Sequence, residues 1–202
     1  VQTCALPICR IYGSANPQLT ATYTGFVNGE NLASSGITGA PALNTIATAS
    51  SRAGIYAITS GVGTLSAGNY EFQYTEGILT IGKATLNISA ENKSRKYGEA
   101  NPSLTYTLNG FVLGESLSNS DVSGLPVLST SASATSAVGS YDIVTGIGNL
   151  SSNNYSFVLN KGTLTIGKAL LSITADNKSR KYGESDRKST RLNSSHVKRS
   201  RM

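Results

Sequence analysis

The chain has 202 residues, of which 17 are Lys or Arg and 11 are Asp or Glu, giving a formal net charge of +6. Six of the basic residues and one acid lie in 185–202, so the rest of the chain carries about +1. That balance excludes the basic surface expected of a nucleic-acid-binding protein. No apolar run approaches the roughly 20 residues that a membrane-spanning helix needs. Residues 10–185 lack Cys and His, which excludes a disulfide framework and a Cys/His metal site there.

The two ends of the chain can be encoded by one DNA segment read in opposite orientations. Codons for Val1–Ile8 can be chosen so that their reverse complement translates as D-R-K-S-T-R-L-N, which is Asp186–Asn193. The string is similar to a translated adapter of a short-read sequencing library. We therefore interpret 1–9 and 186–202 as non-native segments of a metagenomic fragment and exclude them from the fold argument. We expect both segments to lack sustained pairing and burial.

The remaining chain is a tandem repeat with a period of 85 residues. The stretch Y-G-S-A-N-P-Q-L-T at Tyr12 returns as Y-G-E-A-N-P-S-L-T at Tyr97, and a third copy begins around Tyr182. Gly25–Glu30 matches Gly110–Glu115 in the same way, without an insertion. A unit of this length exceeds a solenoid coil and fits a small autonomous domain.

Period-2 alternation dominates each unit and predicts short strands. It is clearest at Leu86–Ala90, where Leu, Ile and Ala alternate with Asn and Ser, and again at Leu171–Ala175. The same pattern predicts strands at Leu104–Leu108, Val127–Ser129, Tyr141–Thr145, Tyr155–Leu159 and Leu164–Ile166. At most one helical turn fits in each unit, near Glu30–Ser34 and Glu115–Asn119. The predicted fold class is mainly β: tandem small β-domains, each sandwich-like or β-grasp-like.

The unit boundaries follow from the order of these strands. T-L-T-I is interpreted as the last strand of one unit and T-L-N-I-S-A as the first strand of the next, which places a boundary between Lys83 and Ala84. The predicted division is 1–9 non-native, 10–83 a first unit without its first strand, 84–168 a complete unit, 169–185 the start of a third unit, and 186–202 non-native.

The repeated residues carry a family resemblance. The motifs R-x-Y-G-x-x-N-P-x-L-T, G-F-V-x-G-E, G-x-Y-x-I, N-Y-x-F and G-T-L-T-I-x-K-A occur in this order over 10–185. This pattern resembles the MBG domain of the YGX type, which occurs in tandem copies in large bacterial surface and secreted proteins, including adhesin-like ones. The resemblance implies an extracellular or cell-surface location and an architectural or adhesive role. It implies no catalytic residues.

The repeat offers little for catalysis, because the Ser-His and Cys-His nucleophile pairs are absent from it. Three pairs of acids recur at matching positions: Glu30 and Glu115, Glu91 and Asp176, Glu99 and Glu184. We interpret them as turn or capping residues rather than as the paired carboxylates of a glycosidase. Ser118–Asp121 has too few acids for a calcium loop. We therefore predict no enzyme activity, no cofactor and no metal site.

Tyrosines supply most of the large rings, since the chain has 10 Tyr, 4 Phe and no Trp. Those that recur in register are expected in a small core with their hydroxyls at its surface; they are Tyr12 and Tyr97, Tyr56 and Tyr141, Tyr70 and Tyr155. Tyr23, Tyr74 and Tyr106 do not recur. They are the candidates for exposed rings that stack on a ligand.

Two functions fit these observations. The first is a structural spacer in a stalk of an adhesin-like protein, whose partners are the neighbouring repeats of the same chain. The alternative is a weak glycan- or protein-binding module that acts through tandem avidity. The residues that match between copies are mainly Gly, Asn-Pro, Tyr and alternating aliphatics, which favours the spacer. No nucleic-acid partner is expected, because the basic clusters Lys93–Lys96 and Lys178–Lys181 are short and are interpreted as solvated loop charges.

Overall fold

The computed structural model describes residues 8–179 and 181–183, and the structural statements below concern these residues. Most of the two segments interpreted as non-native, 1–7 and 186–202, lies outside them. The chain divides into 1–169 and 170–202, and each part is described by itself. The described residues form eleven strands and no helix, which confirms the prediction of a mainly β protein. We call 8–83 repeat 1 and 84–168 repeat 2.

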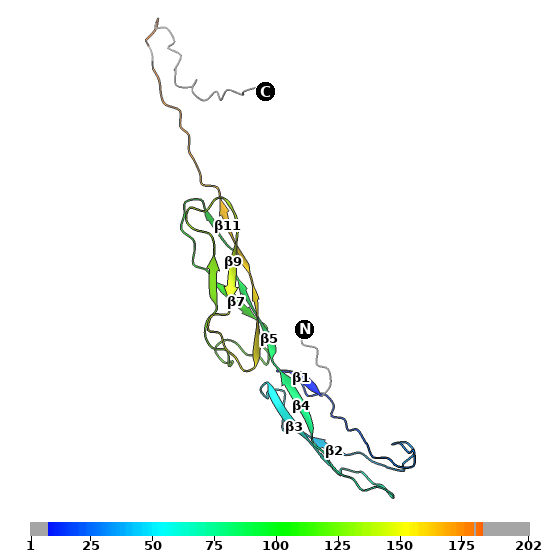
Figure 1. Ribbon diagram of the computed structural model, residues 1–202. Coiled ribbons are helices and arrows are strands. Elements are labelled where there is room, and N and C mark those ends of the chain that lie inside the picture. Colours follow the sequence, from blue (N-terminus) through cyan, green and yellow to red (C-terminus); the bar gives the residue numbers. More distant parts are fainter. Residues whose placement is uncertain (1–7, 180, 184–202) are drawn as a thin grey trace, which may run out of the picture. The chain divides into compact units, whose positions relative to one another are not determined.

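Repeat 1 contains one four-stranded sheet with the strand order β1-β4-β3-β2 (Figure 1). The bounds of its strands are Cys9–Ile11 for β1, Ala42–Asn44 for β2, Gly54–Gly61 for β3 and Gly77–Gly82 for β4. Strands β1 and β4 are parallel, while β3 is antiparallel to both of its neighbours.

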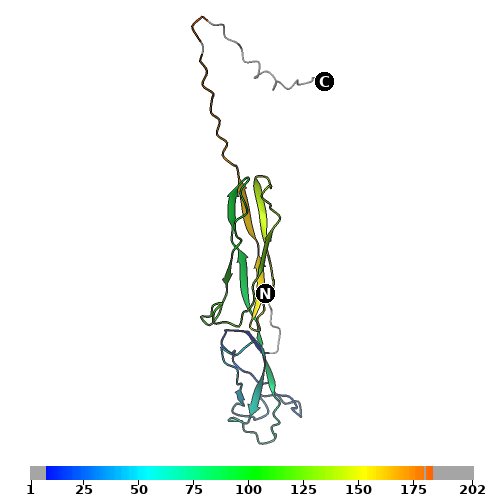
Figure 2. The same ribbon diagram turned by 90° about the vertical axis from the view of Figure 1, so that its left-hand side faces the viewer.

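Repeat 2 contains a four-stranded sheet with the same topology as that of repeat 1, and a second, three-stranded sheet. The strands of both sheets lie along the same axis, some parallel and some antiparallel to one another (Figure 2). The first sheet has the order β6-β11-β9-β8, formed by Lys93–Lys96, Gly162–Gly167, Gly139–Gly146 and Val127–Thr130. The second has the order β10-β5-β7, formed by Tyr155–Asn160, Ala84–Ala90 and Tyr106–Asn109. Strand β5 is the central strand of that second sheet, since it has a partner on each side. It pairs with β10 in parallel and with β7 antiparallel.

The second sheet has no counterpart among the described residues of repeat 1. Shifting β7 and β10 back by one period gives 21–24 and 70–75, where no strand forms. The counterpart of β5 would fall before residue 6, outside the described residues. The division into units at Lys83 and Ala84 stays a prediction, which a fragment experiment below addresses.

The alternation in β5 produces a strand buried along one face. Leu86 and Ile88 are fully buried and Ala90 is 7 % exposed, as the period-2 pattern predicts. Ala90 packs in one cluster with residues of the four-stranded sheet, namely Ile143, Leu164 and Ile166. The two sheets of repeat 2 therefore face each other as in a sandwich.

The third copy of the β5 sequence has a different environment. Leu171 and Ile173, which correspond to Leu86 and Ile88, are 83 % and 90 % exposed. Among the described residues of 169–183 no strand forms, so the strand predicted at Leu171–Ala175 is not observed.

The structure corrects one further prediction. Lys93–Lys96 is strand β6 rather than a solvated loop, and its Arg95 is only 7 % exposed. Cys9 is the first residue of β1 and pairs with Thr80. Because 1–7 lie outside the described residues, the expectation that 1–9 lacks sustained pairing stays a prediction.

Candidate functional site: the junction between the repeats

The junction is organised around a glutamate at the end of a tight turn. In the turn Val112–Glu115, the Glu115 N–H donates to the Val112 carbonyl at 3.0 Å. Both central residues have positive φ, 56° at Leu113 and 71° at Gly114. This is the backbone pattern of a type I′ turn, which Asn-Gly and Gly-Gly adopt most readily. The turn fixes Glu115 beside the neighbouring repeat.

Glu115 accepts hydrogen bonds from tyrosines of both repeats. The Tyr12 hydroxyl of repeat 1 donates to Oε1 at 2.7 Å, and the Tyr155 hydroxyl of repeat 2 donates to Oε2 at 2.6 Å. The two rings meet edge to face, with centroids 5.7 Å apart. Phe111 adds a second edge-to-face contact to Tyr155. One carboxylate thus joins two rings that the sequence places in different repeats.

Burial and the carboxylate together change the acidity of both tyrosines. Tyr12 and Tyr155 are 4 % and 1 % exposed. Burial first, and then the hydrogen bond to Glu115, raise the pKa of each hydroxyl to about 12. Both hydroxyls therefore stay protonated and remain donors at physiological pH.

Further hydrogen bonds, each with a backbone group as donor or acceptor, join the repeats around the buried Asn154. The Ala53 N–H of repeat 1 donates to Asn154 Oδ1 at 3.0 Å, and the Ala84 N–H donates to the Asn154 carbonyl at 2.9 Å. The Lys83 ammonium donates to the Ser152 carbonyl at 2.8 Å. Asp121 holds this loop from within repeat 2, since it accepts from the Ser152 hydroxyl and from two backbone N–H groups.

The glycine of the Y-G motif allows close contact between the repeats. A Cβ atom built on Gly13 would lie 2.5 Å from Val112 Cγ2 of repeat 2, which is too close for any side chain. Its copy Gly98 has open space at the same position. The apolar cluster at this place contains residues from both repeats: Tyr12, Leu79 and Ile81 from repeat 1, and Ala84, Leu86, Val122 and Tyr155 from repeat 2.

Each repeat also contains copies of the junction residues that belong to the other repeat. Repeat 1 has the copies of Tyr155 and Glu115, and repeat 2 has the copy of Tyr12. In repeat 1, Tyr70 donates to Glu30 Oε2 at 2.5 Å and accepts from the Val27 N–H, as Tyr155 does with Glu115 and Val112. In repeat 2, Tyr97 is the copy of Tyr12 but is 50 % exposed. The prediction that the recurrent tyrosines lie in the core is therefore wrong for Tyr97.

A buried arginine connects the strand before the Y-G motif to a distant loop. In repeat 2, Arg95 Nε donates to Asn101 Oδ1 at 2.7 Å, and Nη2 donates to the Ser133 carbonyl at 2.5 Å. Asn101 Nδ2 in turn donates to the Ala132 carbonyl at 2.6 Å. Repeat 1 has the same network, formed by Arg10, Asn16, Thr48 and Ala47. We call this network the Arg–Asn clamp.

The sequence carried a signal for the clamp that was missed. Lys96 of repeat 2 is replaced by Ile11 in repeat 1, whereas Arg95 and Arg10 both remain Arg. When the Arg is kept in both repeats while the basic residue next to it is not, the guanidinium is expected to have a specific partner. The Asn of the N-P motif is that partner in both repeats.

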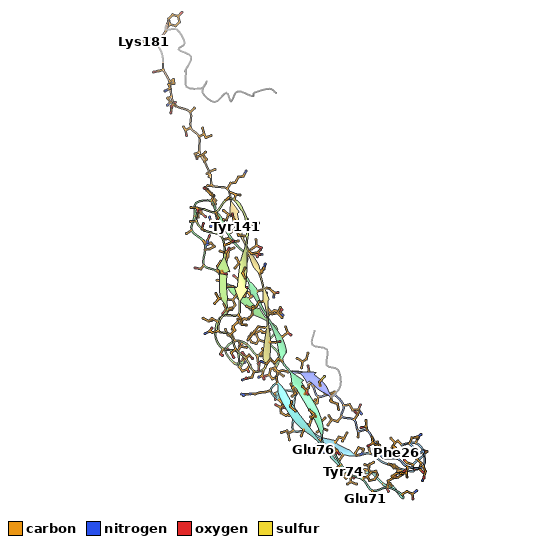
Figure 3. All side chains as sticks on the ribbon, viewed as in Figure 1. Phe26, Glu71, Tyr74, Glu76, Tyr141 and Lys181 are labelled. Atoms are coloured by element: carbon orange, nitrogen blue, oxygen red, sulfur yellow. The ribbon has the colours of Figure 1, made fainter. Side chains whose placement is uncertain are left out.

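Two of the three tyrosines proposed to stack on a ligand lie together. Tyr23 and Tyr74 line a groove of about 720 Å³ in repeat 1, bounded by 20–26 on one side and 70–78 on the other. Figure 3 labels Phe26, Glu71, Tyr74 and Glu76 in this part of the molecule. Tyr106 lies elsewhere, on β7, where it pairs with Ala90. Whether any of the three rings binds a ligand stays a prediction.

The recurrent acids have different environments. Glu99 accepts from the Lys96 N–H at 2.7 Å and is a turn-capping residue. Glu91 accepts from Thr105 and pairs with Lys93. Glu115 follows a turn, as predicted, but its main contacts are to the two tyrosines of the junction. The described residues contain no group of three His, Cys, Asp or Glu side chains placed to hold a metal ion.

Among the described residues, no helix has the length and hydropathy to cross a membrane.

Comparison with known proteins places the chain in a family. A search of curated proteins finds no match. The MBG domain (YGX type) family matches residues 8–80 and 86–165, one match in each repeat. The chain therefore belongs to the MBG domain family of the YGX type and carries two such domains in tandem.

Proposed function

We propose that the chain is a structural spacer from the stalk of a large bacterial cell-surface or secreted adhesin-like protein. In this role the repeats hold an adhesive part at a distance, and the property that matters is stiff coupling between neighbours. The observation that carries the proposal is the Tyr12–Glu115–Tyr155 junction. It joins the repeats through charge-assisted hydrogen bonds and a shared apolar cluster.

The positions of the recurring motif residues support a structural role. The Tyr and Gly of Y-G, and the Val and Glu of G-F-V-x-G-E, meet at the junction. The Arg and Asn that flank Y-G form the clamp. Residues that recur for catalysis would converge instead on a space open to substrate. The proposed protein is therefore extracellular and not an enzyme, and it needs no cofactor and no nucleic-acid partner.

The alternative of a glycan- or protein-binding module has weaker support. Avidity requires a site that is repeated in each copy. Tyr23 and Tyr74 line the groove of repeat 1, but one period later their positions are Leu108 and Leu159. The groove-lining rings are thus not reproduced in repeat 2.

Stiff coupling can be measured in solution by residual dipolar couplings of backbone N–H groups. If the repeats are rigidly coupled, repeats 1 and 2 fit one common alignment tensor. The variant Glu115→Ala removes the acceptor of both tyrosines, so the two repeats should then require different tensors while each stays folded. Glu76→Ala, an exposed glutamate of repeat 1, is the matched control and should keep the common tensor. Separate tensors in the unaltered chain would contradict the spacer role.

The location is tested independently of the stiffness. Antibodies against this chain should label intact cells of the source organism that carry the parent protein, and protease added outside the cells should remove the signal. Labelling that requires permeabilised cells would contradict the surface location while leaving the coupling result unaffected.

A further inference from the structure

One face of the four-stranded sheet in repeat 1 is apolar and exposed. Ile55 of β3 lies opposite Thr80 of β4, and Ala57 lies opposite Ile78, so these four side chains share one face of the sheet. Ile11 of β1 lies on the same face, as the register of β1 with β4 shows. Ile11, Ile55 and Ile78 are 46 %, 74 % and 49 % exposed. We call the surface formed by these five residues the isoleucine face.

The opposite face of the same sheet forms the core. Leu79 and Ile81 alternate with Ile78 and Thr80 along β4 and are at most 2 % exposed. Ile58 of β3 packs in one cluster with them. A strand with one buried face ordinarily carries polar side chains on its other face, which is solvated. The isoleucine face departs from this pattern.

The corresponding sheet of repeat 2 follows the ordinary pattern. One period after Ile11, Ile55, Ala57 and Ile78, the chain has Lys96, Ser140, Asp142 and Thr163. Asp142 also forms an ion pair with Lys161 at 2.8 Å. Since both repeats form this sheet with the same topology, the fold does not require isoleucine at these positions. An exposed apolar patch that the fold does not require indicates a contact with another molecule.

The composition of the isoleucine face indicates the kind of partner. None of the described side chains that β1, β3 and β4 place on this face is charged or aromatic, and the nearest acid along β4, Glu76, precedes the strand. A glycan, which needs several convergent polar groups, does not fit such a surface. A sheet face of branched aliphatic side chains packs best on another such face, with the two sheets about 10 Å apart.

The same face of a second copy meets these requirements. A two-fold axis places each side chain near an identical set on the partner, and an uncharged face accepts this without repulsion between like charges. The outer face of repeat 2 is a poorer partner. It offers Val127 and Val144, which are 58 % and 42 % exposed, but Asp142 lies two residues from Val144 on the same side of β9. Covering this face would remove an ion pair from water, which is costly.

The size of the face determines how strong the contact is. Three strands about 4.8 Å apart, each presenting about six residues with a rise of about 3.3 Å, give a face of roughly 300 Å² per copy. Two copies would then bury roughly 600 Å² in total, less than the roughly 1,200 Å² at which stable complexes begin. The contact is therefore weak between two free copies and becomes effective where many copies are held side by side.

We propose that the isoleucine face of repeat 1 is a lateral contact surface that binds the same face of a second copy of this chain. Ile78 on β4 lies between the strands that carry Ile11 and Ile55, so the three isoleucines form one continuous row across the contact. The proposal goes beyond the spacer role and does not depend on it, because the contact joins copies side by side rather than repeats along one chain.

The first experiment measures self-association of the full 202-residue chain. Sedimentation equilibrium at increasing concentration, up to the millimolar range, should show a monomer–dimer equilibrium that ends at the dimer, since a two-fold contact closes on itself. Amide resonances of β3 and β4 should shift over the same concentration range. A chain that stays monomeric throughout, or shifts confined to repeat 2, would overturn the proposal.

Variants that carry the residues of repeat 2 test the face without endangering the fold. Ile55→Ser and Ile78→Thr each install the residue that the corresponding sheet of repeat 2 has at that position. Each should weaken dimerisation about 10-fold or more, because it removes aliphatic surface from both sides of the contact. Ala57→Asp should abolish dimerisation, because it places an unpaired carboxylate in the contact. Dimerisation that survives Ala57→Asp would overturn the proposal, and circular dichroism verifies that each variant is folded.

The reciprocal exchange in repeat 2 is the matched control. Val144→Thr installs the residue of repeat 1, Thr59, at an exposed position of the corresponding sheet face. It also removes exposed aliphatic surface, yet it should change dimerisation less than about twofold, as a surface exchange outside the contact does. A loss equal to that of Ile78→Thr would place the contact on repeat 2 and overturn the pairing of the isoleucine face with itself.

Discussion

The Tyr12 hydroxyl donates to Glu115 at 2.7 Å although the two residues are 103 positions apart and belong to different repeats. The first belongs to the Y-G motif and the second to the G-F-V-x-G-E motif. Their contact explains why both motifs recur together at one period, because each repeat supplies the tyrosine for the glutamate of the next.

Removing the Tyr12 hydroxyl should destabilise the two-repeat unit. The hydrogen bond is made to a carboxylate in a buried setting, so Tyr12→Phe should lower the free energy of unfolding by about 1.5–3 kcal/mol. Tyr97→Phe makes the same chemical change at the exposed copy of this residue and should cost less than about 0.5 kcal/mol. Urea unfolding measures both. Similar losses in the two variants would contradict the role of the junction.

The Arg–Asn clamp predicts that conservative exchanges at two neighbouring basic residues change the free energy of unfolding by very different amounts. Arg95→Lys cannot reproduce the geometry in which one guanidinium reaches Asn101 and Ser133, so it should cost about 2–3 kcal/mol. Lys96→Arg exchanges the same residue types at an exposed position of β6 and should change the free energy of unfolding by less than about 0.5 kcal/mol. Thermal melts of the two variants compare them directly.

Alkaline pH should weaken the junction. Burial and Glu115 raise the pKa of Tyr12 and Tyr155 to about 12, while the unfolded chain has tyrosines near 10. The unfolded state therefore loses these protons first, and the stability they contribute is complete below about pH 10 and is lost as pH rises to about 12. Urea unfolding at a series of pH values should show this fall, and Tyr155→Phe should make it smaller. A free energy of unfolding that does not change between about pH 10 and pH 12 would contradict the stabilising role of the Tyr12 and Tyr155 hydroxyls.

The turn before Glu115 contains a correctable strain. Leu113 has a φ of 56°, a conformation that costs a branched side chain about 1 kcal/mol or more. Repeat 1 has Asn28 at this position, with a φ of 55°. Leu113→Asn should therefore raise the free energy of unfolding by about 1 kcal/mol, because Asn tolerates this region and the Leu113 side chain is half exposed. Asn28→Leu should lower it by a similar amount, and equal signs for the two changes would refute the explanation.

The predicted unit boundary can be tested with two fragments. Ala84–Lys168 contains both sheets of its repeat, so it should unfold cooperatively on its own. Arg10–Lys83 has only the four-stranded sheet and should not, since the apolar residues of a missing strand contribute roughly 1.5–3 kcal/mol each to a total of about 5–15 kcal/mol. Adding T-L-N-I-S-A before Arg10 should restore folding. A fragment Arg10–Lys83 as stable as Ala84–Lys168 would move the boundary.

Much of the fold could be predicted from local sequence. The 85-residue period and the alternation of Leu86, Ile88 and Ala90 depend only on neighbours in the chain, and both agree with the observed strands. Burial of Arg95 could not be predicted in this way. Its acceptors are a side chain six residues away and a carbonyl 38 residues away, and only the folded chain brings them together.

Identical sequence motifs acquired different environments because burial depends on what lies opposite. Tyr12 and Tyr97 sit in the same motif, yet one is 4 % exposed and the other 50 %. Leu86 and Leu171 begin nearly the same strand sequence, yet one is fully buried and the other is 83 % exposed. The sequence by itself determined which residues are able to form a strand or a junction. The tertiary structure decided which of them do, because a strand needs neighbours for its hydrogen bonds and a tyrosine needs an adjacent repeat to bury its ring.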